Sequence, residues 1–171
     1  MIPLRGLWTL LPSLVLLGCA TKMVVTPELP PLGDTAGFQL TGAIRYEGNR
    51  EYLPRLLKDD PANRFTLRYV HQAAYGGQDI PAVAALFNPL TVIGFPTGDR
   101  QLTIIGRLDV VAESGEVVKS YTATSVMERT RSLWSDETLS ELRRRGLLAV
   151  RDNIEAQLYQ ERDFLRNLLG Q

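Results

Sequence analysis

The sequence is poor in the residues on which most small catalytic and metal sites depend. It has one cysteine and one histidine among 171 residues. A single cysteine excludes a disulfide within the chain, and a single histidine, His71, excludes a histidine-rich metal site. No Gly-x-Ser-x-Gly segment accompanies His71, and no glycine-rich segment has the Lys-Ser/Thr ending of a phosphate loop. We therefore expect a protein that is not an enzyme and that uses no cofactor or metal.

The chain also lacks an excess of charge of either sign. It has 19 Lys and Arg residues against 19 Asp and Glu residues. Without a broad basic excess, we expect no nucleic-acid partner. The basic run Arg143–Arg145 is compatible with a phosphate or lipid headgroup site, but the pattern favours a solvated helix face with Glu141 and Asp152 as local partners. His71 falls on the apolar side of its strand, so we expect a core histidine rather than a catalytic one.

The first 18 residues have the pattern of an export signal. Arg5 precedes an apolar run over Leu7–Leu17, and the small residue Gly18 follows. A positive start, an apolar run of about 7–15 residues and a small residue at the cleavage site are typical of such signals. A membrane-spanning helix needs about 20 apolar residues, and Pro12 interrupts this run. We expect a signal peptide over residues 1–18.

The segment Leu16-Leu17-Gly18-Cys19 resembles the lipobox of bacterial lipoproteins. Leu16 and Gly18 match the pattern, whereas Leu17 departs from it because a smaller residue is commoner there. The resemblance implies cleavage between Gly18 and Cys19, and fatty-acyl chains such as palmitate on Cys19 that anchor the protein in a membrane. Ala20, in place of an aspartate, implies the outer membrane of the cell envelope, facing the periplasm. The alternatives are a secretory signal with a chance cysteine and an uncleaved N-terminal helix.

Residues 19–37 are expected to form the lipidated cysteine and a tether. Prolines and glycines recur in this stretch, and Pro-rich linkers are semi-rigid spacers. Met23–Val25 is an alternative short edge strand. Residues 38–171 then form a single periplasmic domain.

Alternating apolar residues predict four strands within this domain. The ranges are 38–46, 65–71, 102–111 and 117–127. A period of two is typical of strands with one buried face. The loop 113–116 contains Gly115 and predicts a hairpin between the last two strands.

Two helices are predicted in addition. A short helix is expected over Arg50–Lys58, and a long one follows Ser135, which can cap it with Asp136 and Glu137 in its first turn. Gly146 predicts a kink or a division of the long helix. The fold class is therefore α+β, with an antiparallel sheet of about four strands packed against a long C-terminal helix and one or two short helices.

The segment Ile80–Pro96 is the most unusual stretch after Cys19. It contains no charged residue, and three prolines interrupt it. It is either a buried crossover between strands or an exposed apolar loop, and exposed apolar patches commonly mark binding sites. In the second case, the surface for a partner or ligand would comprise Leu86, Phe87, Leu90, Val92, Ile93 and Phe95.

Together these features predict a lipoprotein that acts through protein contacts. The expected role is in envelope assembly or maintenance, with a protein partner or self-association. In layout alone, residues 38–169 are similar to periplasmic lipoproteins of the curli-assembly and transport-auxiliary kind. One alternative is a module that binds lipid or another apolar ligand through residues 80–96. A further alternative is a hydrolase with scattered catalytic residues and His71 as its base.

Overall fold

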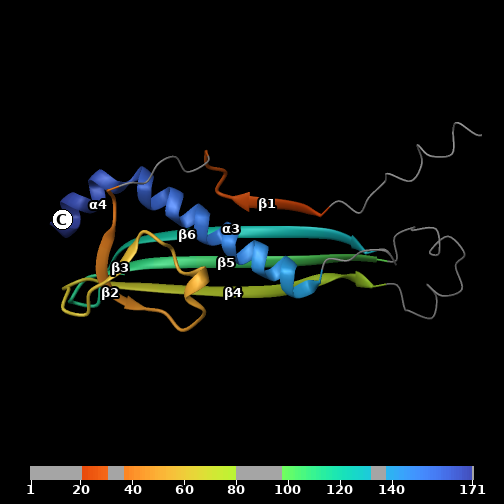
Figure 1. Cartoon of the computed structure of the whole chain (residues 1–171), viewed down its shortest axis with the longest axis horizontal. Coiled ribbons are helices and arrows are strands. Elements are labelled where there is room, and N and C mark those ends of the chain that lie inside the picture. Colours follow the sequence, from red (N-terminus) through yellow and green to blue (C-terminus); the bar gives the residue numbers. More distant parts are fainter. Residues whose placement is uncertain (1–20, 31–36, 80–97, 132–137, 171) are drawn as a thin grey trace, which may run out of the picture.

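One mixed sheet forms the framework of the protein. The computed structural model describes residues 21–30, 37–79, 98–131 and 138–170. In this part of the chain, six strands are arranged in the order β1-β6-β5-β4-β2-β3, and helices α3 and α4 follow them in sequence (Figure 1). The α+β class is therefore confirmed. The strands are β1 Lys22–Thr26, β2 Leu40–Arg45, β3 Leu57–Asp59, β4 Thr66–Asp79, β5 Gly98–Val111 and β6 Val117–Arg131.

The sheet has more strands than expected, and not all of them are antiparallel. β1, β6, β5 and β4 pair antiparallel, whereas β2 pairs in parallel with both β4 and β3. β3 lies in the region where a helix over Arg50–Lys58 was expected. Only the 3-10 helix η3, Arg50–Tyr52, forms there. Pro54 follows it, and a proline cannot supply the N–H that a continuing helix needs.

Strand β1 forms within the stretch expected to be a tether. It pairs antiparallel with β6, and Lys22 lies opposite Glu128. The alternative of an edge strand over Met23–Val25 is therefore what the structure contains. As a result, the sheet begins three residues after Cys19.

The predicted hairpin joins β5 and β6. Gly115 has a φ of 88°, which a glycine adopts without strain. The Ala112 N–H donates to the Glu116 carbonyl at 2.8 Å, and the Gly115 N–H donates to the Ala112 carbonyl at 2.9 Å. We call this end of the sheet the turn end.

The long helix begins later than expected and is not broken at Gly146. α3 spans Leu139–Gln160, and its N-cap is Thr138 rather than Ser135, which lies outside the described residues. The Glu141 N–H donates to Thr138 Oγ1 at 3.2 Å, and the Thr138 N–H donates to Glu141 Oε2 at 2.6 Å. This reciprocal capping box fixes the start of the helix. The chain interrupts the helix only at Glu161, before α4, Arg162–Leu169.

Helix α3 packs on one face of the sheet. A Cβ at Gly146 would collide with Met127 and lie 2.8 Å from Ile104 Cδ1, and one at Gly106 would collide with Val150. The helix thus approaches β5 and β6 closely at two glycines, which explains why Gly146 is tolerated in a helix. The core includes Leu67, Tyr69, Leu102, Ile104, Leu108, Ala123, Met127, Leu142, Leu147, Val150, Ile154 and Leu158.

The two ends of the sheet are separated by the length of its central strands. At one end, Lys22 lies opposite Glu128, Glu128 lies opposite Gln101, and Gln101 lies opposite Gly76, near the end of β4. We call this the Lys22 end. The start of β4 at Thr66 lies at the turn end. At about 3.3 Å per residue, the two levels are about 33 Å apart.

Candidate functional site

The face of the sheet opposite α3, which we call the outer face, exposes apolar side chains. Along β4, Leu67 and Tyr69 are buried toward the helix, so the alternating residues point the other way. Val24, Val70 and Ile105 are 49%, 47% and 45% exposed. These three residues come from three different strands of one face. The outer face therefore presents an apolar centre rather than a purely polar surface.

β-Branched and polar residues surround this apolar centre. The strand register places Ile105 between Gln72 and Thr124, and Val126 between Thr103 and Val24. Arg107 lies opposite Val70 on the same face. The apolar centre is therefore bordered by polar side chains.

A row of arginines lies across the outer face near the turn end. Arg45 of β2 lies opposite Arg68 of β4, and Arg68 lies opposite Asp109 of β5. Arg107 is two residues from Asp109 on the same face. We call Arg45, Arg68 and Arg107 the arginine row.

Asp109 organises two members of the arginine row. Its carboxylate is only 3% exposed. It accepts hydrogen bonds from Arg68 Nη2 at 2.9 Å, Arg107 Nε at 2.7 Å and Ser120 Oγ at 2.6 Å. Burial alone would raise the pKa of Asp109, but the hydrogen bonds from Ser120, Arg107 and Arg68 outweigh it and lower the pKa. Asp109 therefore stays ionised and holds both guanidinium groups in place.

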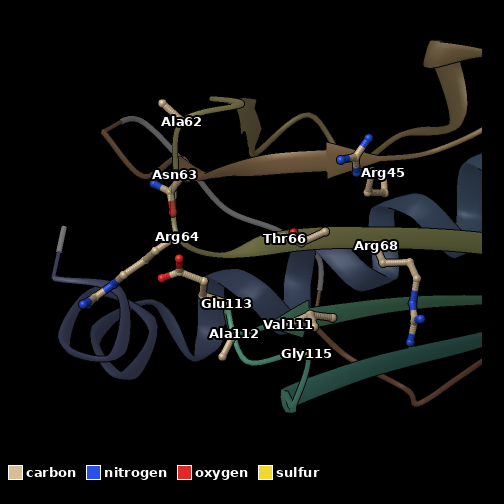
Figure 2. A pocket seen from close by; sticks show the side chains of 10 residues that line it. All are labelled: Arg45, Ala62, Asn63, Arg64, Thr66, Arg68, Val111, Ala112, Glu113 and Gly115. Atoms are coloured by element: carbon tan, nitrogen blue, oxygen red, sulfur yellow. The ribbon is translucent and has the colours of Figure 1, made fainter.

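Arg45 differs from the other two because it has no such partner. It is exposed, and no carboxylate among the described residues forms an ion pair with it. Like charges on directly opposite residues of neighbouring strands are destabilising. Figure 2 shows the Arg45 and Arg68 side chains pointing apart, which separates their charges.

An open pocket adjoins the arginine row at the turn end (Figure 2). Its volume is about 630 Å³. Arg45, Thr66 and Arg68 line one side, and Val111 and Glu113 belong to the same lining. Its arginines point in different directions and do not converge on one atom. The pocket is therefore suited to anionic groups of a larger partner rather than to catalysis on a small substrate. The remaining lining residues are Ala62, Asn63, Arg64, Ala112 and Gly115.

His71 lies on the helix-facing side of β4, as its alternation predicted. Its ring is half-buried, and the ring centroids of Tyr46, Tyr52 and Tyr69 lie 6.0, 6.2 and 6.2 Å away. Burial lowers the pKa of His71, and the positive charge of Arg143 lowers it further. The imidazole is therefore neutral near pH 7. It packs against aromatic rings, and nothing in its described surroundings pairs it with a nucleophile.

The basic run on α3 has different partners from those expected. Arg144 Nη2 lies 2.5 Å from Glu51 Oε1, so it ties the helix to η3. Glu141, the expected partner, is instead used in the helix cap. Arg143 is exposed on the first turns of the helix. The run is thus partly a structural clamp rather than a single binding site.

Segment 49–57 is held on α3 by a buried carboxylate that the sequence did not reveal. Glu155 is 1% exposed. It accepts hydrogen bonds from the Arg55 backbone N–H, from Arg55 Nε at 3.2 Å and from Arg55 Nη2 at 2.8 Å. Glu155 and Asp109 are the two buried carboxylates of the described core. In the sequence, the only indication that Asp109 is buried was its position between two apolar strand residues. Nothing in the sequence indicated that Glu155 is buried.

Most of the site residues predicted from sequence lie outside the part of the chain that the structure describes. The cleavage and lipidation residues Gly18 and Cys19 lie outside the described residues. So do all six residues of the predicted partner surface within Ile80–Pro96. The outer face and the arginine row were not predicted as a site.

The described residues also bear on metal binding and on membrane crossing. They contain no group of three or more His, Cys, Asp or Glu residues close enough to hold a metal ion. Within the same residue ranges, no helix is both long and apolar enough to cross a membrane. The sequence matches no known protein-family model and no curated protein.

Proposed function

We propose that the protein is a lipoprotein anchored through Cys19 in the outer membrane, facing the periplasm, and that it acts by binding another protein rather than by catalysis. The observation that carries the proposal is the outer face, where Val24, Val70 and Ile105 are about half exposed beside the arginine row. Protein interfaces combine an apolar centre with a polar rim, and arginine is enriched in them. A role in envelope assembly or maintenance is consistent with such a tethered binding domain.

The anchor can be tested directly on the mature protein. We expect metabolic labelling with an alkyne-bearing fatty acid to label the wild type, and Cys19→Ser to abolish the label. Each buried CH₂ contributes about 0.8 kcal/mol of membrane affinity, so two or more chains hold the protein stably. An unlabelled wild type that retains residues 1–18, detected by mass spectrometry, would contradict the anchor.

The binding face can be tested by site-specific photocrosslinking in the native cell. We expect a photoreactive residue at Ile105 to give a discrete protein adduct, and the same residue at Asn167 of α4, also exposed, to give none. An added Val70→Glu substitution should remove the Ile105 adduct while leaving the thermal unfolding temperature unchanged. Equal adducts from Ile105 and Asn167, or an adduct that survives Val70→Glu, would refute the outer face as the binding surface.

A second candidate is binding of lipid or another apolar ligand through residues 80–96. The observation that favours it is the strand register, in which Asp79 pairs with Gly98 beyond the level of Gly76 and Gln101. Asp79 and Gly98 thus lie at the Lys22 end of the sheet, and Lys22 itself is three residues from the proposed lipid on Cys19. Three residues span at most about 11 Å.

This second candidate predicts that a charge in the segment abolishes ligand binding. We expect Leu86→Asp or Val92→Asp to abolish binding of apolar ligand by the lipidated protein, while Ser114→Asp at the turn end has no effect. The binding assay is fluorescence of an apolar dye. If Leu86→Asp and Val92→Asp instead prevent folding, residues 80–96 are core, and the second candidate is excluded.

A further inference from the structure

We propose that the arginine row binds a carboxylate-bearing segment of the protein partner, with Arg45 as its main contact. The inference deepens the proposed function, because it gives the chemistry of the partner that the outer face would bind. It rests on the charge, register and exposure of three arginines and on the pocket beside them.

The arginine row carries more positive charge than the one carboxylate within it neutralises. Three guanidinium groups lie on neighbouring strands of one face, whereas Asp109 supplies one carboxylate among them. Asp109 is 3% exposed and already binds Arg68, Arg107 and Ser120. It therefore has little capacity left for Arg45. An incoming carboxylate beside Arg45 would offset this excess of positive charge.

The geometry favours an acidic segment over a single small anion. The Arg45 and Arg68 side chains point apart (Figure 2), so carboxylates spaced along a segment match them better than one small anion does. Arg–carboxylate pairs are frequently bidentate and are among the stronger hydrogen bonds. The open pocket of about 630 Å³ beside Arg45 and Arg68 leaves room for further residues of the same segment. Val70 and Ile105 lie on the same face and would contact its apolar side chains.

The position in the molecule favours a protein over the lipid headgroups of the anchoring membrane. Arg68 lies on β4 eight residues from Gly76 at the Lys22 end. At about 3.3 Å per residue this is about 26 Å. The proposed anchor at Cys19 adjoins the Lys22 end, so the arginine row lies about 26 Å along the sheet from the end where the proposed anchor attaches.

The test measures binding of labelled peptides to the lipidated full-length protein in detergent. The probes are a peptide of four Glu-Val repeats and its Gln-Val and Lys-Val counterparts, followed by fluorescence anisotropy. We expect the Glu-Val peptide to bind at least about tenfold more tightly than the Gln-Val peptide at low salt, and this preference to shrink in 0.5 M NaCl because salt screens exposed charges. Equal affinity for the two peptides would overturn the proposal.

Arg45→Gln is the decisive variant, because Arg45 is exposed and takes no part in the Asp109 network. We expect it to weaken Glu-Val binding roughly fivefold or more, the effect of about one charge-assisted contact. Arg45→Glu should instead favour the Lys-Val peptide. Lys22→Gln makes the same charge change on the same face at the Lys22 end, and we expect it to leave Glu-Val binding unchanged. Equal losses from Arg45→Gln and Lys22→Gln would refute a local site.

Two further measurements separate this inference from the proposed function. Vesicles of phosphatidylcholine with and without phosphatidylglycerol test the lipid alternative. Arg45-dependent binding to the anionic vesicles without a preference for the Glu-Val peptide would overturn the proposal in favour of lipid.

If the Ile105 adduct persists in Arg45→Gln cells and the peptide preference is absent, the inference fails while the protein-binding face stands. If fatty-acid labelling of Cys19 fails, the anchor fails, and the peptide assay still reports on the arginine row.

Discussion

His71 is a side chain through which pH can change the stability of the fold. It is the only histidine in the chain, and three tyrosine rings surround it. Its neutral ring is accommodated beside Arg143, whereas a protonated ring would place a second positive charge there. The face on which it lies followed from sequence alternation. Its aromatic surroundings did not, because Tyr46 and Tyr52 reach it only through long-range packing.

We expect His71→Gln to flatten the dependence of stability on pH below about 6.5. The pKa of His71 is lowered in the folded protein, whereas the unfolded value is about 6.5. The unfolded state therefore binds the proton first, and the free energy of unfolding falls as the pH drops below about 6.5, until the folded protein also protonates. Urea unfolding between pH 5 and about 8 measures this slope. An identical slope in wild type and His71→Gln would contradict this reading.

Gly106 of β5 is one of two glycines at which helix α3 and the sheet approach closely. A Cβ there would collide with Val150 Cγ1 and lie 3.2 Å from Tyr69 Oη. We expect Gly106→Ala to lower the free energy of unfolding by about 1–3 kcal/mol, since overpacking forces neighbours to move. Gly76→Ala is the matched control, because its Cβ would meet only the Gln101 side chain, with Oε1 at 3.7 Å and Cβ at 4.0 Å. Denaturant unfolding should show that Gly76→Ala is neutral or slightly stabilising. Equal losses for both variants would argue against close packing at Gly106.

At the scale of elements, local patterns predicted strands better than they predicted sheet pairing. The hairpin of β5 and β6 was visible because both strands alternate and Gly115 lies between them. The parallel pairing of β2 with β4 was not visible, since it depends on how segment 49–57 returns to the sheet. The arginine row was therefore unpredictable as a site.

Two features of α3, where it begins and that it continues through Gly146, depend on more than the local sequence. Ser135 and Thr138 can both cap a helix, and the choice of Thr138 follows from Glu141 three residues later. Gly146 weakens a helix locally by about 1 kcal/mol relative to alanine. Close packing against Met127 and Ile104 is incompatible with a larger residue there. Tertiary packing therefore outweighs the local propensity.

We expect Glu155→Gln to loosen segment 49–57 from α3. Glu155 is 1% exposed and accepts several hydrogen bonds from Arg55. Loss of its charge should cost about 1–3 kcal/mol of stability and increase hydrogen exchange in 49–57. Asp152→Asn is the control, because the Asp152 side chain is 50% exposed and lies 3.4 Å from Arg55 Nη2. Surface ion pairs contribute about 0–1 kcal/mol. Unchanged exchange in Glu155→Gln would show that apolar packing alone holds the segment.

At the scale of the whole molecule, stability is expected to be uneven across the sheet. The central strands β4, β5 and β6 are long and have neighbours on both edges, whereas β1 is five residues long and pairs only with β6. Short edge elements open at a lower free energy than the core. The proposed anchor thus adjoins a less stable part of the sheet.

We expect native-state hydrogen exchange to separate β1 from the central strands. Amides of β1 should exchange through local opening, with little dependence on dilute denaturant. Amides of Leu67, Ile104 and Ala123 should exchange only through global unfolding. Mass spectrometry of peptic peptides measures the exchange rates of both groups of amides. If β1 exchanges as slowly as β5, the edge strand is an integral part of the cooperative core.

The antiparallel pairing of β1 with β6 has a mechanical consequence. If Cys19 is held in a membrane and a partner pulls on the domain, tension enters β1 at Lys22 and runs along the strand axis. Hydrogen bonds of an antiparallel pair are perpendicular to the strands, so the load is a shear that they resist together rather than one after another. Asn153 Nδ2 of α3 donates to the Pro27 carbonyl at 2.7 Å, just beyond the end of β1. A single-molecule experiment that pulls between residue 19 and the C-terminus should therefore show a distinct rupture force for this strand.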